Sequence, residues 1–585
     1  MIRGQKKTLF QLLCTLWIYI EWRRKKQLLA TLILMLTSAM AEVFSIGAAL
    51  PFLGALTSPQ KVFESPLFQP LFKVLGVSSS GEIVLSLTIF FCSAVILSAV
   101  IRIAVLWVTL RLSFAIGADL SSSMYQKTLY QPYSVHISRN SSEVINGVSV
   151  KSNSVVYNII YPILNIITSC IVLAAILMAM MYVQPLIAII AFACLGVIYL
   201  SIGYVARKFL KSCSTLIARS SDQVIKSLQE GLGGIRDILI DNSQSIYAEI
   251  YKNADRTLRR AQGNIQFIGA SPRFAMEALG MILIALFGFR LSQTEGGMTS
   301  AIPVLGALAL GAQRLIPVLQ QIFSSWSGIK GGEASLGDVI MFLEQPLPKH
   351  AFDVRQISPI IFNNTIALEG VTFGYESSPP WVVSNLNLII KKGSRVGIIG
   401  TTGCGKSTLL DILMGLLSPT KGALLVDDFP VTNQNHRAWQ QHIAHVPQSI
   451  YLADTTIAEN IAFGVPKEQI DMNLVKMAAT QAQMDCVIMG WERQYDTIVG
   501  ERGMRLSGGQ RQRIGIARAL YKRADVIIFD EATSALDSGT EDAVMNAINL
   551  LSKDLTILIV AHRESTLKKC DSVYRMNEGK ISHVK

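Results

Sequence analysis

Apolar and polar positions divide the chain into two parts, because the apolar excess is confined to about the first 325 residues. Leu28–Leu56 and Ile83–Leu110 each carry one charge, and Val155–Ala206 carries none over about 52 residues. Since a membrane helix needs roughly 20 apolar residues, these runs predict four spans, the last run supplying two. Phe274–Leu291 and Met298–Phe323 predict two more. An even number of spans places both ends of the chain on the same side of a membrane.

The connections between the predicted spans differ in charge. Basic residues concentrate at Arg23–Lys26, in 111–151 and in 207–260, whereas the connection 57–82 has two lysines. The positive-inside rule therefore places the N-terminus, both long loops and everything after about residue 325 in the cytoplasm. The basic segment directly before a full-length span also argues against a cleavable signal peptide.

Composition agrees with a membrane protein. Half of the 585 residues are apolar and 16% are charged, below the roughly 25% that is usual for soluble domains, which disfavours disorder, collagen and an ordinary cytosolic enzyme. The net charge of +12 follows from the cytoplasmic loops, so no nucleic-acid partner is expected. The eight cysteines are scattered without CxxC pairs, which predicts neither a zinc site nor a disulfide scaffold.

The two long cytoplasmic connections remain compatible with helix, so the membrane helices are expected to continue well beyond the bilayer. Proline and glycine mark the turning points at 131–133 and 231–234, and a short helix beside each turn could dock on a cytoplasmic domain. The helical pattern ends near Pro346. We therefore expect an all-α polytopic membrane domain with six long helices over 1–345, a linker over 346–364 and a soluble domain over 365–585.

The soluble part contains a phosphate-binding pattern. The strand-like run 396–399 leads into a GxxxxGK[ST] loop, and a helix-like segment follows. In this context backbone N–H groups wrap phosphates at a helix N-terminus, Lys406 lies by the β and γ phosphates, and the Ser407 hydroxyl reaches Mg²⁺. The pattern predicts an α/β P-loop NTPase whose nucleotide-binding loop consists of Gly400, Thr401, Thr402, Gly403, Cys404, Gly405, Lys406, Ser407 and Thr408.

Two carboxylates end a second apolar strand, which runs from Val526 to Phe529. Ligands of open α/β sheets bind at this end of the strands. Asp530 can hold Mg²⁺ through water, and Glu531 can act as general base on an attacking water. His562 follows another strand-like segment and is a candidate contact of the γ phosphate.

The segment Leu506-Ser507-Gly508-Gly509-Gln510 precedes these carboxylates by about twenty residues and resembles the signature motif of ATP-binding cassette (ABC) proteins. Six spans followed by one cassette resemble a half-transporter of the ABC exporter type. The resemblance implies that Gln448 belongs to the Q-loop at the catalytic Mg²⁺, that Tyr375 stacks on adenine, and that Asp537 lies in the D-loop. It also assigns 501–503 to the exporter segment before the signature and His562 to the H-loop.

The resemblance further implies a homodimer. In this family the signature motif contacts the γ phosphate of ATP bound to the opposite subunit, so one cassette cannot complete a site. Ser507 and Gly509 of one chain would then join Lys406, Gln448 and Glu531 of the other. ATP and Mg²⁺ are the expected cofactors, and both sites are expected to hydrolyse ATP.

Charged residues inside the predicted spans indicate the substrate. Arg102, Arg290 and Arg314 come from three spans, and an ionisable residue there is a functional candidate by default. Guanidinium groups in a central cavity would bind a phosphate or pyrophosphate. The alternative is that Arg290 snorkels and that Arg102 and Arg314 pair with Glu277 or Glu42.

The membrane half resembles bacterial flippases of lipid-linked oligosaccharides, which implies an ATP-driven flippase in the inner (plasma) membrane. Its aromatic, amphipathic connection 61–75 is either an interfacial segment that steers a lipid tail or a cover over helix ends. A lipid A-like lipid, drug or peptide exporter is the main alternative, and an ABC-type channel or regulatory ATPase is a third.

Overall fold

The computed structural model describes residues 7–57, 83–183, 185–292, 297–347, 360–376, 378–531, 539, 541, 554–561 and 567–585, and within these ranges some side chains of the membrane helices are also not described. It contains two compact units. One comprises Met1–Gln131 and Arg139–Leu347, and the other comprises Pro132–Ser138 and Pro348–Lys585. The predicted external segment 61–75, the D-loop Asp537 and His562 lie outside the described residues.

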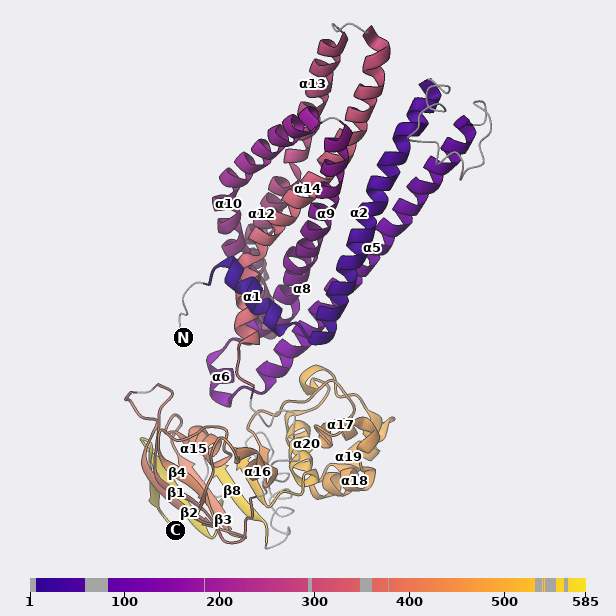
Figure 1. Ribbon diagram of the computed structural model, residues 1–585. Coiled ribbons are helices and arrows are strands. Elements are labelled where there is room, and N and C mark those ends of the chain that lie inside the picture. Colours follow the sequence, from indigo (N-terminus) through magenta and orange to yellow (C-terminus); the bar gives the residue numbers. More distant parts are fainter. Residues whose placement is uncertain are drawn as a thin grey trace. The chain divides into compact units, whose positions relative to one another are not determined.

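The regular elements among the described residues of the first unit are all helices (Figure 1). Its apolar runs form helices much longer than a bilayer requires at 1.5 Å per residue. The helices are α1 (Leu9–Tyr19), α2 (Trp22–Thr57), α5 (Ile83–Leu129), α7 (Ser141–Ile145), α8 (Ser152–Val155), α9 (Tyr161–Val183), α10 (Pro185–Gly233), α11 (Ile235–Ile240), α12 (Gln244–Ala270), α13 (Pro272–Ser292) and α14 (Gly297–Leu343).

The predicted extension of the membrane helices is confirmed. The helix α5 has 47 residues and ends just before Pro132, and α10 has 49 residues and ends at the predicted glycine turn. Among the described residues, three helical stretches are long and apolar enough to cross a membrane, namely Trp22–Leu56, Ile83–Leu129 and Ser141–Met178. The other predicted spans fall on α10, α13 and α14, where many side chains are not described, so the count of six stays a prediction.

The segment between α7 and α9 departs from regular α-helix. Two π-helical stretches, η1 (Asn146–Lys151) and η2 (Val156–Ile160), flank the short helix α8. Such bulges are rare and occur mostly at functional positions. Lys151, the last residue of η1, is buried, and its ammonium lies 2.9 Å from Asp222 of α10 and 2.6 Å from Asp338 of α14. This ion-pair cluster joins three long helices.

The second unit contains two sheets. The six-stranded sheet has the order β10-β9-β3-β8-β7-β6, and its pairs are parallel except for β9–β10. A four-stranded antiparallel sheet has the order β2-β1-β4-β5. The strands are β1 (Thr365–Phe373), β2 (Val383–Lys391), β3 (Arg395–Gly400), β4 (Lys421–Val426), β5 (Phe429–Pro430), β6 (Ile443–Val446), β7 (Val526–Asp530), β8 (Thr556–Ala561), β9 (Ser572–Asn577) and β10 (Lys580–His583).

Two apolar cores support the six-stranded sheet. One is shared with the four-stranded sheet and with α15 (Lys406–Leu413), and Trp439 of α16 (His436–Gln441) is buried in it. The other includes buried side chains from a helical region that lies apart from the strands in Figure 1. This region contains α17 (Ile457–Ile461), α18 (Met472–Gln481), α19 (Asp485–Met489) and α20 (Gly508–Tyr521). The α/β fold predicted for the second part of the chain is confirmed.

Candidate functional site: a nucleotide site and a neighbouring groove

The predicted phosphate loop lies between β3 and α15, as its sequence requires. Gly403 and Gly405 have φ angles of +83° and +104°, a region that side chains with a Cβ rarely adopt. A Cβ at Gly400 would lie 2.5 Å from the carbonyl oxygen of Met576, and one at Gly405 would lie 2.9 Å from that of Val382. The glycines therefore permit a backbone path that keeps the loop N–H groups at the start of α15, which is the geometry that cradles phosphate.

Lys406 belongs to this cradle. It is buried, and its ammonium donates hydrogen bonds to the carbonyl oxygens of Gly400 (2.7 Å) and Thr401 (3.0 Å). The charge is thus held over the loop, where phosphate oxygens can replace the carbonyl acceptors. Ser407 is exposed beside it. Both side chains fit the phosphates and Mg²⁺ that the sequence predicts for this loop.

The edge of the parallel sheet brings two predicted catalytic residues together. Gln448 follows β6 and Glu531 follows β7, and the Gln448 amide donates to the Glu531 carboxylate at 2.7 Å. Glu531 has a φ of +51°, and its backbone N–H donates to the Val560 carbonyl of β8 at 3.0 Å. A residue other than glycine with a positive φ stores roughly 1–2 kcal/mol of backbone strain. The hydrogen bond to Val560 holds Glu531 in this conformation.

Mg²⁺ would need few protein ligands here. Among the described residues no group of three or more His, Cys, Asp or Glu side chains could hold a metal ion. In nucleotide sites, Mg²⁺ takes one or two protein oxygens together with phosphates and water. Ser407, Gln448 and Asp530 remain the predicted contacts of the metal.

Asp411 of α15 is a carboxylate that the sequence analysis missed. Burial, followed by the nearby charge of Asp530, raises the pKa of Asp411 to about 6. Burial and the charges of Asp411 and Tyr375 also raise the pKa of Tyr133 in α6 (Tyr133–Ser138). Only the three-dimensional arrangement brings these groups together, because they come from separate parts of the sequence.

The predicted adenine contact lies on a loop after β1. The Tyr375 ring is 56% exposed and packs edge-on against Phe373, with ring centroids 5.3 Å apart. Its hydroxyl lies 3.1 Å from the Thr408 hydroxyl of α15. The ring is therefore tied to the helix that follows the phosphate loop and still presents an open face for stacking.

The signature segment forms a helix start. Ser507 is the N-cap of α20, its hydroxyl accepts from the Gln510 N–H at 3.2 Å, and the Gln510 side chain accepts from the Ser507 N–H at 2.9 Å. This capping box fixes the first turn, in which Gly508 and Gly509 lie. The turn belongs to the helical region, whereas the phosphate loop belongs to the sheet.

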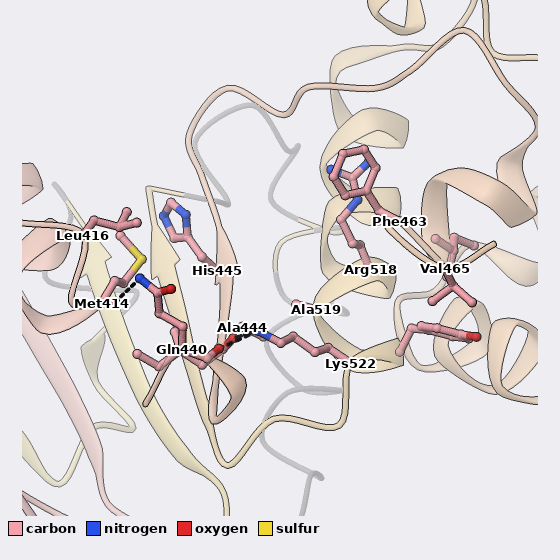
Figure 2. Close-up of a pocket in the computed structure, with 13 residues that line it drawn as sticks. Met414, Leu416, Gln440, Ala444, His445, Phe463, Val465, Arg518, Ala519 and Lys522 are labelled. Carbon is pink, nitrogen blue, oxygen red and sulfur yellow. Dashed lines mark hydrogen bonds between the residues drawn. The ribbon is translucent and has the colours of Figure 1, made fainter. Parts of the chain in front are cut away.

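A groove of about 630 Å³ separates these two parts of the cassette (Figure 2). Its sheet side includes Met414, Leu416 and His445, and its helical side includes Phe463 and Arg518. The Arg518 guanidinium lies 4.5 Å from the centroid of the Phe463 ring, which is 54% exposed. Burial lowers the pKa of His445 to about 4, so this side chain is neutral at physiological pH.

The predicted substrate arginines are only partly described. The Arg102 guanidinium lies 3.5 Å from the Glu42 carboxylate, and the Arg102 side chain is 57% exposed while that of Glu42 is 5% exposed. Glu277 pairs instead with Arg273 at 2.7 Å. The side chains of Arg290 and Arg314 lie outside the described residues. One of the pairings that the sequence left open is therefore present, and Arg102 keeps a surface for a ligand.

Comparison with known proteins agrees with this architecture. The protein family described as the ABC transporter transmembrane region matches residues 28–343 of this chain. The family described as ABC transporter matches residues 383–534. An "ATP-dependent lipid A-core flippase" of Saccharophagus degradans is 27% identical over 88% of this chain and 86% of its own. The "ABC transporter ATM1" of Toxoplasma gondii is 36% identical over 38% of this chain and 21% of its own.

A solved "bacterial Atm1-family ABC exporter with ATP bound" has the same fold, with a TM-score of 0.78 and 21% sequence identity, and the match covers 96% of this chain and 94% of the other. The phosphate loop, the carboxylates at the end of β7 and the capped signature turn are the parts to which the sequence analysis assigns ATP binding and hydrolysis. The chain belongs to the ABC transporters, as an exporter half-transporter that joins one helical membrane domain to one ATP-hydrolysing cassette.

Proposed function

We propose that the protein works as a homodimer with two composite ATP sites. Each site would combine Lys406, Ser407, Gln448, Asp530, Glu531 and His562 of one chain with Ser507 and Gly509 of the other. The capped first turn of α20 supports this arrangement, because the backbone N–H groups of Gly508 and Gly509 and the positive helix end can meet a phosphate brought by a second cassette. Glu531, held by Gln448, is the proposed general base.

We further propose that the dimer flips a lipid with a large polar head group across the bacterial inner membrane, with both termini in the cytoplasm. A polyprenyl-pyrophosphate-linked oligosaccharide is the candidate that the intramembrane arginines favour, and a lipid A-like glycolipid fits as well. The names of the relatives support the glycolipid class. The exposed Arg102 side chain supports an anionic head group.

The groove in the cassette is the proposed point of coupling to the membrane domain. The turn between α10 and α11 carries apolar side chains that are exposed in the single chain, with Leu232 at 70% and Ile235 at 47%. Phe463 and the aliphatic residues of the groove match such a surface. We propose that the turn between α10 and α11 of the second copy of the chain binds in this groove. In a background whose eight native cysteines are replaced by serine, a Leu232→Cys/Phe463→Cys variant should then form a disulfide-linked dimer, whereas variants that carry only one of the two new cysteines should not.

The transport experiment is reconstitution into proteoliposomes with a panel of fluorescent lipids. ATP-dependent exchange between leaflets is expected for phosphate-bearing glycolipids with the wild-type chain, and not for phosphatidylcholine. Glu531→Gln should bind ATP and fail to flip, because it removes the general base, which contributes roughly 10²–10⁴-fold. If no phosphate-bearing lipid moves while drugs stimulate ATP turnover, the drug-exporter alternative holds instead.

The arginines distinguish these two functions. A drug exporter would use Arg102, Arg290 and Arg314 for helix packing, so replacing all three by alanine would leave transport intact. A flippase of an anionic lipid should lose most transport in the same variant. Basal ATP hydrolysis, measured in both cases, separates a transport defect from a folding defect.

A further inference from the structure

An apolar cavity of about 910 Å³ lies at the start of the membrane domain. Figure 1 shows α1 crossing the bundle before the chain turns into α2. The cavity lies at this turn, between α1, α2 and α9, with Leu16, Leu29, Met35, Ile163 and Leu164 among its lining. Its volume is in the range of sites for small ligands, roughly 300–1,000 Å³.

Two lysines give the cavity a charged end. Lys25 and Lys26 line it, and their ammonium groups lie 5.3 Å from the Trp17 ring centroid and 5.9 Å from that of Trp22. Within the part of the chain that the structure describes, neither lysine forms an ion pair. Arg24 directly precedes them in the sequence, and its guanidinium binds the carboxylate of Asp119 at 2.7 Å, which joins α2 to α5. Asp119 therefore pairs with Arg24, and the ammonium groups of Lys25 and Lys26 remain at the cavity.

The opposite end of the cavity is aliphatic. From Lys25 to Met35 the helix α2 rises about 15 Å at 1.5 Å per residue, and its lining side chains change from ammonium groups to Leu28, Leu29, Leu32 and Met35. The charged end also contains two indole rings, which favour the interface between head groups and acyl chains. Along the cavity, the lining therefore changes from lysine ammonium groups to indole rings and then to aliphatic side chains. A membrane lipid presents matching groups in the same order, namely its phosphate, its glycerol and its acyl chain.

We propose that this cavity is a binding site for one anionic phospholipid of the cytoplasmic leaflet, whose phosphate contacts Lys25 and Lys26 and whose acyl chain lies along α2 and α9. The N-terminal end of α2 adds positive potential at the phosphate. A zwitterionic lipid offers the same acyl chain but no net negative charge, so the lysines make the site selective. The site does not depend on which lipid the protein transports.

The test uses tryptophan quenching by brominated lipids in the full-length protein. A Trp107→Phe/Trp326→Phe background leaves Trp17 and Trp22 as the tryptophans of the membrane domain. In phosphatidylcholine nanodiscs, brominated phosphatidylglycerol should quench at about tenfold lower mole fraction than brominated phosphatidylcholine, since each lysine near a membrane surface strengthens anionic binding severalfold. Equal quenching by the two lipids would refute selectivity.

Two variants keep the test specific. Lys25→Gln/Lys26→Gln should abolish the preference for phosphatidylglycerol, whereas Arg23→Gln/Arg111→Gln removes two cations outside the cavity lining and should keep it. Ile163→Phe fills the cavity and should weaken quenching by both lipids. Loss of the preference in the control variant, or unchanged quenching in Ile163→Phe, would contradict the proposal.

A second measurement does not rely on fluorescence. A ligand that binds the folded state raises the unfolding temperature by mass action, so phosphatidylglycerol should stabilise the wild-type chain more than the Lys25→Gln/Lys26→Gln variant. An equal stabilisation of both chains would count against the site. Neither measurement needs nucleotide or transported lipid, so its failure is distinct from failure of the proposed function.

Discussion

Asp411 gives the cassette a pH dependence that can be worked out from one residue. Its pKa rises from 3.8 to about 6 because the carboxyl is buried near Asp530. The folded state therefore holds this proton more tightly than the unfolded state, and stability falls as pH rises from about 4 to 6. Asp411→Asn should raise the unfolding temperature at pH 7.5 and change it little at pH 4.5. After discounting for partial exposure we expect about 1 kcal/mol, or roughly 2–4 °C.

Asp427 is a control for Asp411, because its pKa is shifted in the opposite direction. Although partial burial opposes it, hydrogen bonds from the backbone N–H groups of Thr365, Asn363 and Asn364 lower the pKa of Asp427. Its contribution to stability is present above the unfolded pKa and is lost as pH falls through the folded value. Asp427→Asn should thus destabilise the protein at pH 7.5. A uniform response of both variants to pH would contradict the assignment of either shift.

Gln448 is expected to act on catalysis through Glu531. Its amide is the donor to the Glu531 carboxylate in the structure, at 2.7 Å. Gln448→Ala removes a hydrogen bond to a charged group, worth roughly 1.5–3 kcal/mol, and frees the carboxylate to rotate. We expect kcat for ATP to fall at least tenfold while nucleotide affinity changes a few-fold. Steady-state ATPase and equilibrium binding of a fluorescent ATP analogue separate the two effects.

At the scale of elements, the Lys151 cluster holds together three helices of the membrane domain. Lys151 is 4% exposed, whereas the Asp222 and Asp338 side chains are each about one-third exposed. Removing the central cation leaves two carboxylates facing each other, and the cost is below the 3–5 kcal/mol of a fully buried pair. Lys151→Met should destabilise the domain by about 2 kcal/mol.

The matched control for Lys151→Met is Lys226→Met. Lys226 pairs with Glu230 at 3.7 Å on the exposed surface of α10, the helix that carries Asp222, and such pairs contribute little. Thermal unfolding of both variants in detergent measures the difference. A destabilisation by Lys226→Met as large as that by Lys151→Met would remove the special role of the cluster.

Elements set by local chemistry were predictable from the sequence, and those set by tertiary contacts were not. Pro132 lies just past the end of α5 and cannot donate a helical hydrogen bond, and α10 ends at Gly233, where a run of glycines lowers helix propensity. The phosphate loop has a spacing that few other structures require. Local spacing does not encode the ion-pair cluster around the buried Lys151, the raised pKa of Asp411 or the groove beside Phe463. Each depends on segments far apart in the chain.

At the scale of the whole molecule, the signature turn and the phosphate loop of one chain occupy different parts of the cassette, which raises the question of which chain completes which site. The answer follows from a mixing experiment. Lys406→Ala disables the phosphate loop of its own chain, and Ser507→Arg disables the signature turn. Either variant alone would form a homodimer in which both composite sites are damaged.

Mixing the two variants should restore one site. In a mixed dimer, one interface combines both damaged elements, and the other combines the intact Lys406 loop of the Ser507→Arg chain with the intact Ser507 turn of the Lys406→Ala chain. Each mixed dimer should therefore trap about one molecule of labelled ATP, although the homodimer of either variant traps none. If mixing restores no trapping while a mixture of wild type and Lys406→Ala still traps ATP, the sites are not shared between chains, and each cassette must close on its own nucleotide.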